Sequence, residues 1–214
     1  MQTRGLDTTS NIHSTSIRSD KADQTPYADL EKAVLANNPS ADRKLLRDAF
    51  NYAKEVHSHQ TRDEGTPYFN HPYRVAMYMA NEMHVGDANA IATGLLHDVM
   101  EDGKGVTRSV LEEKFNDDVA RNVSLLSKKK VPDSQHEQML TTYYEGIKKA
   151  PLDVKRVKIS DRLDNIRSLH LSPDKEKVPR YIKETREIYL PMAKECFAGA
   201  AKEIENILKN LEAK

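Results

Sequence analysis

Residues 94–102 read GLLHDVMED, which places a histidine and three acids at the end of an otherwise apolar helical run. On one continuous helix, residues four apart share a face, so His97 is expected to lie over Glu101 and Asp98 over Asp102. Carboxylates crowded in this way repel one another unless a cation or protons neutralise them. A solvated helix end is the alternative, but acids at the C-terminal end of a helix oppose its macrodipole. Because imidazole is a common nitrogen ligand for transition metals, the pattern predicts a metal site built for hydrolysis.

Apolar residues recur with helical spacing outward from this stretch along almost the whole chain, and no convincing alternation of period two is present. The pattern predicts an all-α fold of about nine helices. Capping residues and prolines set several boundaries, among them Asp87, Thr107 and Pro151. Helices are expected over residues 42–57, 71–83, 87–102, 107–115, 116–126, 135–149, 151–169 and 179–214. Pro191 is expected to kink or restart the last of them.

Two regions of different character divide the chain. Residues 1–26 are rich in Ser, Thr, Asp, Gln and Asn and have no hydrophobic period, which predicts a disordered polar leader. Residues 27–214 are expected to form one domain, because 214 residues suffice for a single substantial core.

Composition excludes several classes of protein. Lys plus Arg and Asp plus Glu both total 33, so the formal net charge is zero, which argues against a nucleic-acid protein held by bulk charge. The single cysteine, Cys196, cannot form an internal disulfide, which fits a reducing compartment. No apolar run is long enough to span a bilayer, and the N-terminus lacks the apolar core of a signal peptide. The expected location is the cytoplasm.

Two further segments offer metal-type side chains. The stretch GTPYFNHP, residues 65–72, fixes His71 at a helix start after a rigid loop. The stretch KISDRLDN, residues 158–165, places Asp161 and Asn165 on one helix face, four positions apart. Alone, His71 is better explained as a capping residue and the second stretch as a charged surface. Together with residues 94–102, they predict one site with ligands from three segments.

The pattern His71, His97-Asp98 and Asp161 resembles the HD superfamily of metal-dependent phosphohydrolases. The flanking residues resemble the hydrolase domain of the Rel/SpoT family and the stand-alone small alarmone hydrolases. The resemblance spans roughly residues 42–195 and implies an HD-domain helical bundle. The matching stretches are GTPYFNHP (65–72), LLHDVMED (95–102), KISDRLDNIR (158–167) and ETREIYLPMA (184–193).

The resemblance also implies a metal centre and its chemistry. Glu101 and Asp102 match an acidic pair that positions and activates the attacking water in this family. Mixed nitrogen and carboxylate ligands suit manganese, the metal that the family uses, and would also bind zinc or iron. The implied ligands of the single divalent ion are His71, His97, Asp98 and Asp161.

A nucleotide pocket is implied in the same way. Arg62 matches an arginine that packs on a guanine base, and Asn165 and Ser168 match positions that line the pocket. The implied substrate is guanosine tetra- or pentaphosphate, whose 3′-pyrophosphate would leave as one unit to give GDP or GTP. Lys158, a neighbour of these positions, could meet phosphate charge or be a solvated cation, as could Arg162 and Arg167. Residues 128–130, three lysines, are expected to be a solvated turn.

Some positions depart from the family pattern. A second basic residue commonly follows the arginine matched by Arg62, but here Asp63 and Glu64 follow. Histidine is common in the family where Asp164 stands. Residues 103–105, Gly-Lys-Gly, replace the threonine that usually follows the acidic pair. No departure removes a predicted ligand, but all bear on which nucleotide fits.

Three functions remain open from the sequence. The first is a manganese-dependent alarmone pyrophosphohydrolase. The second is a related phosphohydrolase acting on another nucleotide, including removal of the 2′-phosphate of NADPH, as animal relatives suggest. The third is a non-catalytic nucleotide-sensing module, which loss of any ligand would have favoured. About twenty residues follow Pro191, too few for synthetase and regulatory domains, so a hydrolase-only protein or a fragment of a longer parent is expected. The sequence leaves the oligomeric state open.

Overall fold

Helices make up most of the computed structural model, which describes residues 25–63, 65–174 and 176–213. The α-helices are α2 (Thr25–Asn37), α3 (Arg43–Val56), α4 (Asn70–Asn81), α5 (Ala88–Leu96), α6 (Val99–Asp102), α7 (Arg108–Lys114), α8 (Asp117–Leu126), α9 (His136–Lys149), α10 (Leu152–Ser168), α11 (Lys177–Glu184), α12 (Leu190–Cys196) and α13 (Ala198–Glu212). Short 3-10 turns, η1 (Asp133–Gln135) and η2 (Leu169–Leu171), and a π-helical turn, η3 (Thr185–Tyr189), lie between them. The described residues contain one isolated β-bridge and no strand, so the all-α prediction is confirmed.

The N-terminal end of the described chain is helical. The predicted leader, residues 1–26, lies outside the described residues except for its last two positions, where α2 begins. This helix was not among the predicted ones, although Leu30 and Val34 on it are fully buried in the core. Across the described ranges, no helix is both long and apolar enough to cross a lipid bilayer.

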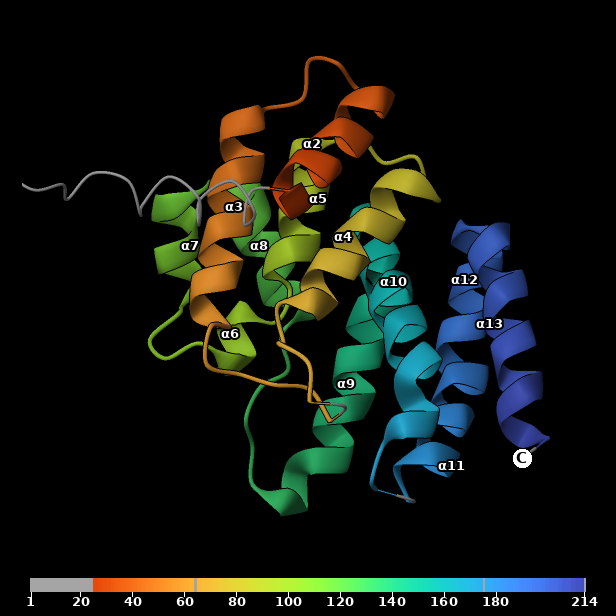
Figure 1. Cartoon of the computed structure of the whole chain (residues 1–214). Helices are drawn as coiled ribbons and strands as arrows, with labels where there is room; N and C mark the ends of the chain where they lie inside the picture. The colour runs from red at the N-terminus through yellow and green to blue at the C-terminus, as the bar shows by residue number, and fades with distance from the viewer. Residues whose placement is uncertain (1–24, 64, 175, 214) are drawn as a thin grey trace, which may run out of the picture.

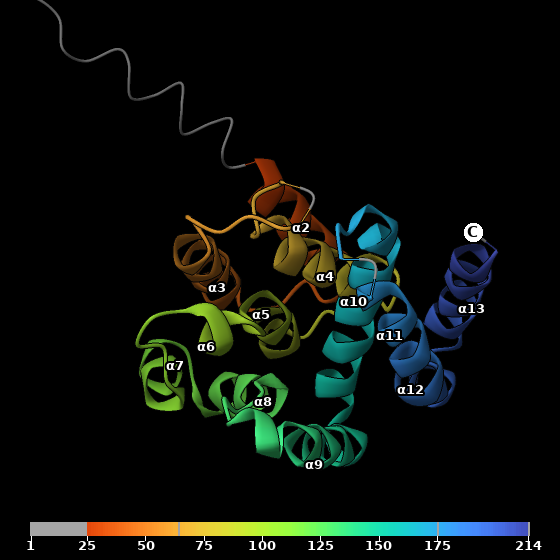
Figure 2. The same cartoon turned by 90° about the horizontal axis from the view of Figure 1, so that it is seen from below.

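Helix α10 occupies the centre of the fold. It runs beside α4, and seen from below it stands between the α2–α8 group and the α11–α13 group (Figures 1 and 2). Because neighbours surround it, α10 buries apolar residues such as Ile159 and Leu163 and also polar ones such as Asp161 and Asp164. Buried polar groups need partners, so this helix must carry an organised polar centre.

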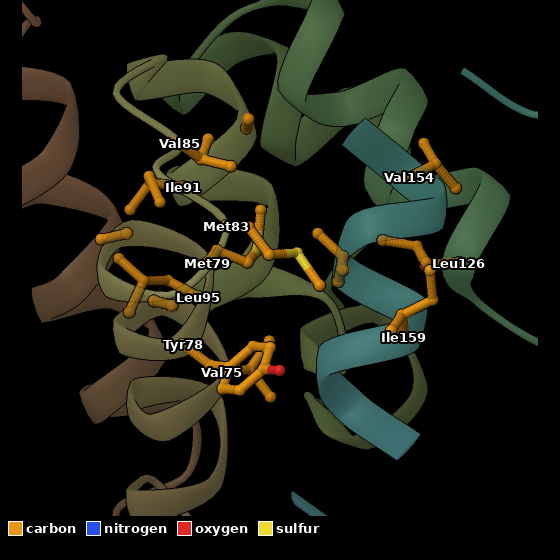
Figure 3. Close-up of a cluster of buried hydrophobic side chains, with 14 of the residues drawn as sticks. Val75, Tyr78, Met79, Met83, Val85, Ile91, Leu95, Leu126, Val154 and Ile159 are labelled. Carbon is orange, nitrogen blue, oxygen red and sulfur yellow. The ribbon is translucent and has the colours of Figure 1, made fainter. Parts of the chain in front are cut away.

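The apolar core joins α4, α5 and α10 (Figure 3). Full burial of each large apolar side chain stabilises the fold by about 1.5–3 kcal/mol. Gly94 allows α5 to approach α4 closely, since a Cβ at this position would lie 2.9 Å from Met79 Sδ. The core residues labelled in the figure include Val75 and Met79 of α4, Ile91 and Leu95 of α5, and Val154 and Ile159 of α10.

Most predicted helix boundaries match the structure. Asp87 caps α5 by accepting a hydrogen bond from the Ala90 N–H at 2.9 Å, and Thr107 caps α7 in the same way. The predicted continuous helix over residues 87–102 is wrong, because α5 ends at Leu96 and α6 begins at Val99. The interruption is confined to His97 and Asp98, and the Asp102 N–H still donates to the Asp98 carbonyl at 3.1 Å, so these two residues remain one helical turn apart as expected.

The C-terminal segment is also divided. The predicted helix over 179–214 begins at Lys177 and widens into η3 just before Pro191, which has no N–H to donate to the preceding turn. Phe197 then adopts an extended conformation, with φ −160° and ψ 96°, and separates α12 from α13. The sequence predicted the irregularity at Pro191 but not the break at Phe197.

Candidate metal centre and its pocket

The four predicted metal ligands come from three places in the fold. His71 lies in the first turn of α4, His97 and Asp98 form the junction of α5 and α6, and Asp161 lies in the middle of α10. At this junction His97 and Asp98 keep α-helical backbone angles, with φ and ψ of −59° and −29° for His97 and −100° and −8° for Asp98. The interruption that the sequence missed therefore lies within the site.

Donor atoms of His71, His97 and Asp98 converge, and Asp161 lies beside them. His71 Nε2 lies 3.3 Å from Asp161 Oδ1 and 3.7 Å from Asp98 Oδ2. His97 Nε2 lies 3.1 Å from Asp98 Oδ2 and 4.0 Å from Asp161 Oδ1. Both histidines are 1% exposed. Ligand atoms of His71, His97 and Asp98 all lie within 4.8 Å of one another, as a shared metal ion requires.

Hydrogen bonding on the far side of each ring leaves the Nε2 atoms for a metal. His97 Nδ1 donates to the Gly94 carbonyl at 2.8 Å, one of the last carbonyls of α5, and its buried Nε2 has no hydrogen-bond partner among the described residues. An unpartnered buried polar atom costs about 1–3 kcal/mol, and a cation bound to its lone pair would remove that cost. His71 Nδ1 likewise bonds Asp164 Oδ2 at 2.7 Å. The donor set fits a divalent transition metal.

Electrostatic interactions favour the charged forms of these groups. Burial alone would lower the pKa of His71, but its hydrogen bonds to Asp161 and Asp164 raise that pKa to about 9 in the metal-free protein, so a metal ion at Nε2 would displace the proton there. Burial opposes ionisation of Asp161, but the Lys158 ammonium, whose Nζ lies 2.8 Å from Asp161 Oδ2, holds the pKa of this carboxyl well below its usual range. The imidazoles of His97 and His71 lower the pKa of Asp98 in the same way, again against burial. The carboxylates are therefore ready to bind a cation.

The two predicted catalytic acids have different surroundings. Glu101 lines the cavity in front of the ligands, and its Oε1 accepts a hydrogen bond from the Lys128 backbone N–H at 2.7 Å. Asp102 is not among the residues that line the cavity, and burial and the nearby Asp98 charge raise its pKa. A carboxylate fixed at the cavity wall, as Glu101 is, can orient and deprotonate a water.

A cavity of about 270 Å³ opens beside the predicted ligands and contains the predicted nucleotide residues. Arg62 Nη2 donates to Asn165 Oδ1 at 3.0 Å and to Ser168 Oγ at 3.4 Å, so these three residues lie together. Asn165 in turn donates from Nδ2 to Asp161 Oδ1, which joins the pocket to the metal ligands. The cationic side chains that line this cavity are Arg62, Lys128, Lys158, Arg162 and Lys177.

The other predicted cations differ in whether they line the cavity. Lys158 and Arg162 line the cavity, and the Arg162 guanidinium lies 4.4 and 4.0 Å from the ring centres of two tyrosines. Arg167 instead donates to Glu203 on α13 at 2.6 and 3.0 Å. The prediction that residues 128–130 form only a solvated turn is wrong for Lys128, which lines the cavity and lies 5.3 Å from the Tyr143 ring centre.

Sequence reasoning missed several residues of the site. Tyr68 donates its hydroxyl hydrogen to Asp98 Oδ2 at 2.8 Å, and its position three residues before His71 was the available signal. Lys177 pairs with Asp63 at 2.6 Å at the cavity wall, across 114 positions of sequence. Nothing in the local sequence of either residue indicates that pair, because it depends on how α11 packs.

Comparison with known proteins agrees with this geometry. A family model described as "HD domain" matches residues 49–196. A protein of Aquifex aeolicus named guanosine-3′,5′-bis(diphosphate) 3′-pyrophosphohydrolase is 37% identical over 171 residues, which cover 77% of this chain and 23% of that protein. The bifunctional (p)ppGpp synthase/hydrolase SpoT of Escherichia coli is 35% identical over 173 residues, covering 78% and 24%. The GTP pyrophosphokinase rsh of Brucella ovis is 33% identical over 174 residues, covering 77% and 22%.

A solved structure gives the same result. It is titled "A metazoan ortholog of SpoT hydrolyzes ppGpp and plays a role in starvation responses", with a TM-score of 0.68 and 25% identity. The similarity covers 77% of this chain and 93% of that one. The chain spans about a quarter of the length of the curated relatives it matches. Because the family model matches more than half of its length, the chain belongs to the HD-domain family.

Proposed function

We propose that this protein hydrolyses guanosine 3′,5′-bis(diphosphate), in its tetra- or pentaphosphate form, in the cytoplasm. Water attacks the phosphorus atom attached to the 3′ oxygen, and the bond between these two atoms breaks. The water oxygen leaves in pyrophosphate, and a proton goes to the 3′ oxygen, which leaves GDP or GTP. This is the activity in the names of the Aquifex and Escherichia relatives.

One observation supports the proposal most directly. Two imidazole nitrogens and two carboxylates converge beside a cavity that five cationic side chains line. A polyphosphate substrate carries several negative charges that such cations can neutralise. The arrangement suits a reaction in which a metal centre and a highly charged phosphate ester must lie side by side.

The ligands fit manganese, which would polarise a phosphoryl oxygen and lower the pKa of a bound water. Glu101, fixed by the Lys128 N–H, orients that water and accepts its proton. Asp102 assists Glu101 in this step, because the raised pKa of its carboxyl favours holding a proton. The guanidinium of Arg62 packs on the guanine base. Asn165 and Ser168 hold that guanidinium in place by accepting hydrogen bonds from it.

A phosphohydrolase acting on NADPH is the second candidate, and one observation favours it. Asp63 occupies a position where a basic residue is common in the family, and it neutralises Lys177 at the cavity wall. This pair reduces the positive charge available to a substrate with phosphates at both ends. A substrate with a single terminal phosphate monoester would lose less binding energy there.

The test is hydrolysis of guanosine 5′-diphosphate 3′-diphosphate by chelator-stripped protein, with and without Mn²⁺, with products identified by chromatography. NADPH is assayed in parallel, and Asp98→Ala serves as the control for contaminating hydrolases. Release of GDP and pyrophosphate only with Mn²⁺ is expected. Release of phosphate from NADPH alone would select the second candidate. Tight nucleotide binding without turnover of either substrate would select the sensing module instead.

A further inference from the structure

Asp164 is a buried carboxylate to which neither the sequence nor the proposed reaction gives a part. Its side chain is 4% exposed, and its Oδ2 accepts a hydrogen bond from His71 Nδ1 at 2.7 Å. Arg74 donates to the same carboxylate twice, from Nε to Oδ1 at 2.5 Å and from Nη2 to Oδ2 at 3.0 Å. Arg62 Nη1 also lies 3.9 Å from Oδ2. One carboxylate thus contacts a predicted metal ligand and two guanidinium groups.

The bidentate pair with Arg74 fixes the Asp164 carboxylate. A buried carboxylate is stable only when charged partners and hydrogen bonds compensate for lost water, and a bidentate guanidinium supplies both. His71 and Arg74 lie three positions apart on α4, while Asp164 comes from α10. The triad therefore ties the helix that carries His71 to the helix that carries Asp161.

We propose that Asp164, held by Arg74, is the positioning residue of the metal centre. An ionised carboxylate only accepts hydrogen bonds, so His71 Nδ1 must keep its proton, and Nε2 is the nitrogen that can give up its proton and bind the metal. A carboxylate on the far nitrogen also makes an imidazole a stronger ligand. The inference rests on the proposed metal centre and adds a group that controls how tightly the centre holds its ion.

The two hydrogen bonds from Arg74 to position 164 require a carboxylate at that position. A histidine, which is common in the family at the position of Asp164, could not accept two hydrogen bonds from one guanidinium. An asparagine could not serve both neighbours either. If its oxygen faced Arg74, its NH₂ group would face His71 Nδ1. That contact favours the ring form with the proton on Nε2, and a protonated Nε2 cannot bind a metal.

The first experiment measures Mn²⁺ affinity of the chelator-stripped full chain by calorimetry. Asp164→Asn is expected to weaken Mn²⁺ binding by about 10- to 100-fold. Asp153→Asn is the matched control, because Asp153 lies on the same helix and pairs with Arg156 at 2.9 Å near the surface. Thermal melts of both variants verify that each remains folded.

A double-mutant cycle separates positioning from general damage. Arg74→Gln is expected to weaken Mn²⁺ binding in the wild-type background. In the Asp164→Asn background the same change should have little further effect, or should restore affinity by freeing the amide to turn its oxygen toward His71. Equal losses in both backgrounds would overturn the proposal, since they would mean that Arg74 acts without Asp164.

Nitrogen-15 NMR of the zinc-loaded wild-type protein tests the proposal without any substitution. His71 should show a protonated Nδ1 and a metal-bound Nε2. Metal bound at Nδ1, or unchanged affinity in Asp164→Asn, would overturn the inference and leave the metal centre standing. If wild-type protein bound neither Mn²⁺ nor Zn²⁺, the proposed metal centre itself would fail, so the two failures are distinguishable.

Discussion

Asp98 and Glu101 are three positions apart, yet their contacts assign them different tasks. Asp98 Oδ2 lies within 3.7 Å of the Nε2 atoms of His71 and His97. It also accepts a hydrogen bond from Tyr68. Glu101 instead accepts a hydrogen bond from the Lys128 N–H at the cavity wall, outside this group. The first contact set suits the proposed metal ligand, and the second suits the proposed general base.

The first prediction follows from this difference. Asp98→Ala is expected to abolish both bound Mn²⁺ and turnover, because it removes a proposed ligand and leaves the buried imidazoles of His71 and His97 without its carboxylate. Glu101→Ala should reduce turnover by about 10²- to 10⁴-fold while leaving much of the metal in place. Metal analysis and turnover measured on the same preparations check both. An empty site in Glu101→Ala would show that this division of labour is wrong.

The second prediction concerns the raised pKa of Asp102. Its folded-state pKa exceeds the unfolded value of about 3.9, so the ionised carboxyl weakens the metal-free fold at neutral pH. This destabilisation is absent below the unfolded pKa and grows as pH rises through the folded pKa. Asp102→Asn should therefore raise the melting temperature of metal-free protein at pH 7 and lower turnover. The gain should vanish near pH 3.5, and a gain independent of pH would contradict the assignment.

At the scale of elements, the loop between α8 and η1 belongs to the site. Its backbone N–H at Lys128 holds Glu101, although the two residues are 27 positions apart. The loop stays near the cavity because Tyr143 of α9 donates its hydroxyl hydrogen to the Leu126 carbonyl at 2.7 Å. The orientation of the proposed general base, Glu101, thus depends on backbone from another element.

A matched pair of substitutions tests the importance of that loop. Lys128→Pro removes the donor N–H, whereas Lys128→Ala keeps it and removes only the side chain. The proline variant should lose turnover well beyond the loss in the alanine variant, with Mn²⁺ affinity unchanged in both. An equal loss of turnover in the two variants would show that the Lys128 ammonium matters and the backbone hydrogen bond does not.

At the scale of the whole molecule, the metal centre joins elements that are distant in sequence. Helices α4 and α10 and the α5–α6 junction each carry proposed ligands, and α10 stands between the two groups of helices (Figures 1 and 2). An ion bound only when these elements are assembled must stabilise the whole fold by mass action. Binding should therefore be visible in global unfolding.

The fourth prediction states the size of that effect. Mn²⁺ at 100 times its Kd should stabilise the folded protein by about 2.7 kcal/mol. For a chain of this length, this corresponds to a melting temperature about 5–10 °C higher. Differential scanning fluorimetry across a Mn²⁺ titration measures the shift. Asp98→Ala should show no shift, and a shift of equal size there would indicate binding elsewhere.

The sequence by itself determined the class of fold and the four predicted metal ligands. Helical periodicity and caps at Asp87 and Thr107 depend only on local geometry, so they could be predicted without tertiary information. The order of the family-like stretches predicted His71, His97, Asp98 and Asp161, and the structure brings these residues together. Their role as ligands stays a prediction until metal binding is measured.

Only the tertiary structure decided how those residues are oriented and partnered. The turn at His97 and Asp98 replaces the expected continuous helix. The pairing of Asp164 with His71 and Arg74 depends on α4 packing against α10. Such contacts join residues about 90 positions apart, and local pattern carries no information about which distant groups meet. Packing of the apolar core fixes the distance between helices, and that distance decides which buried charges find partners.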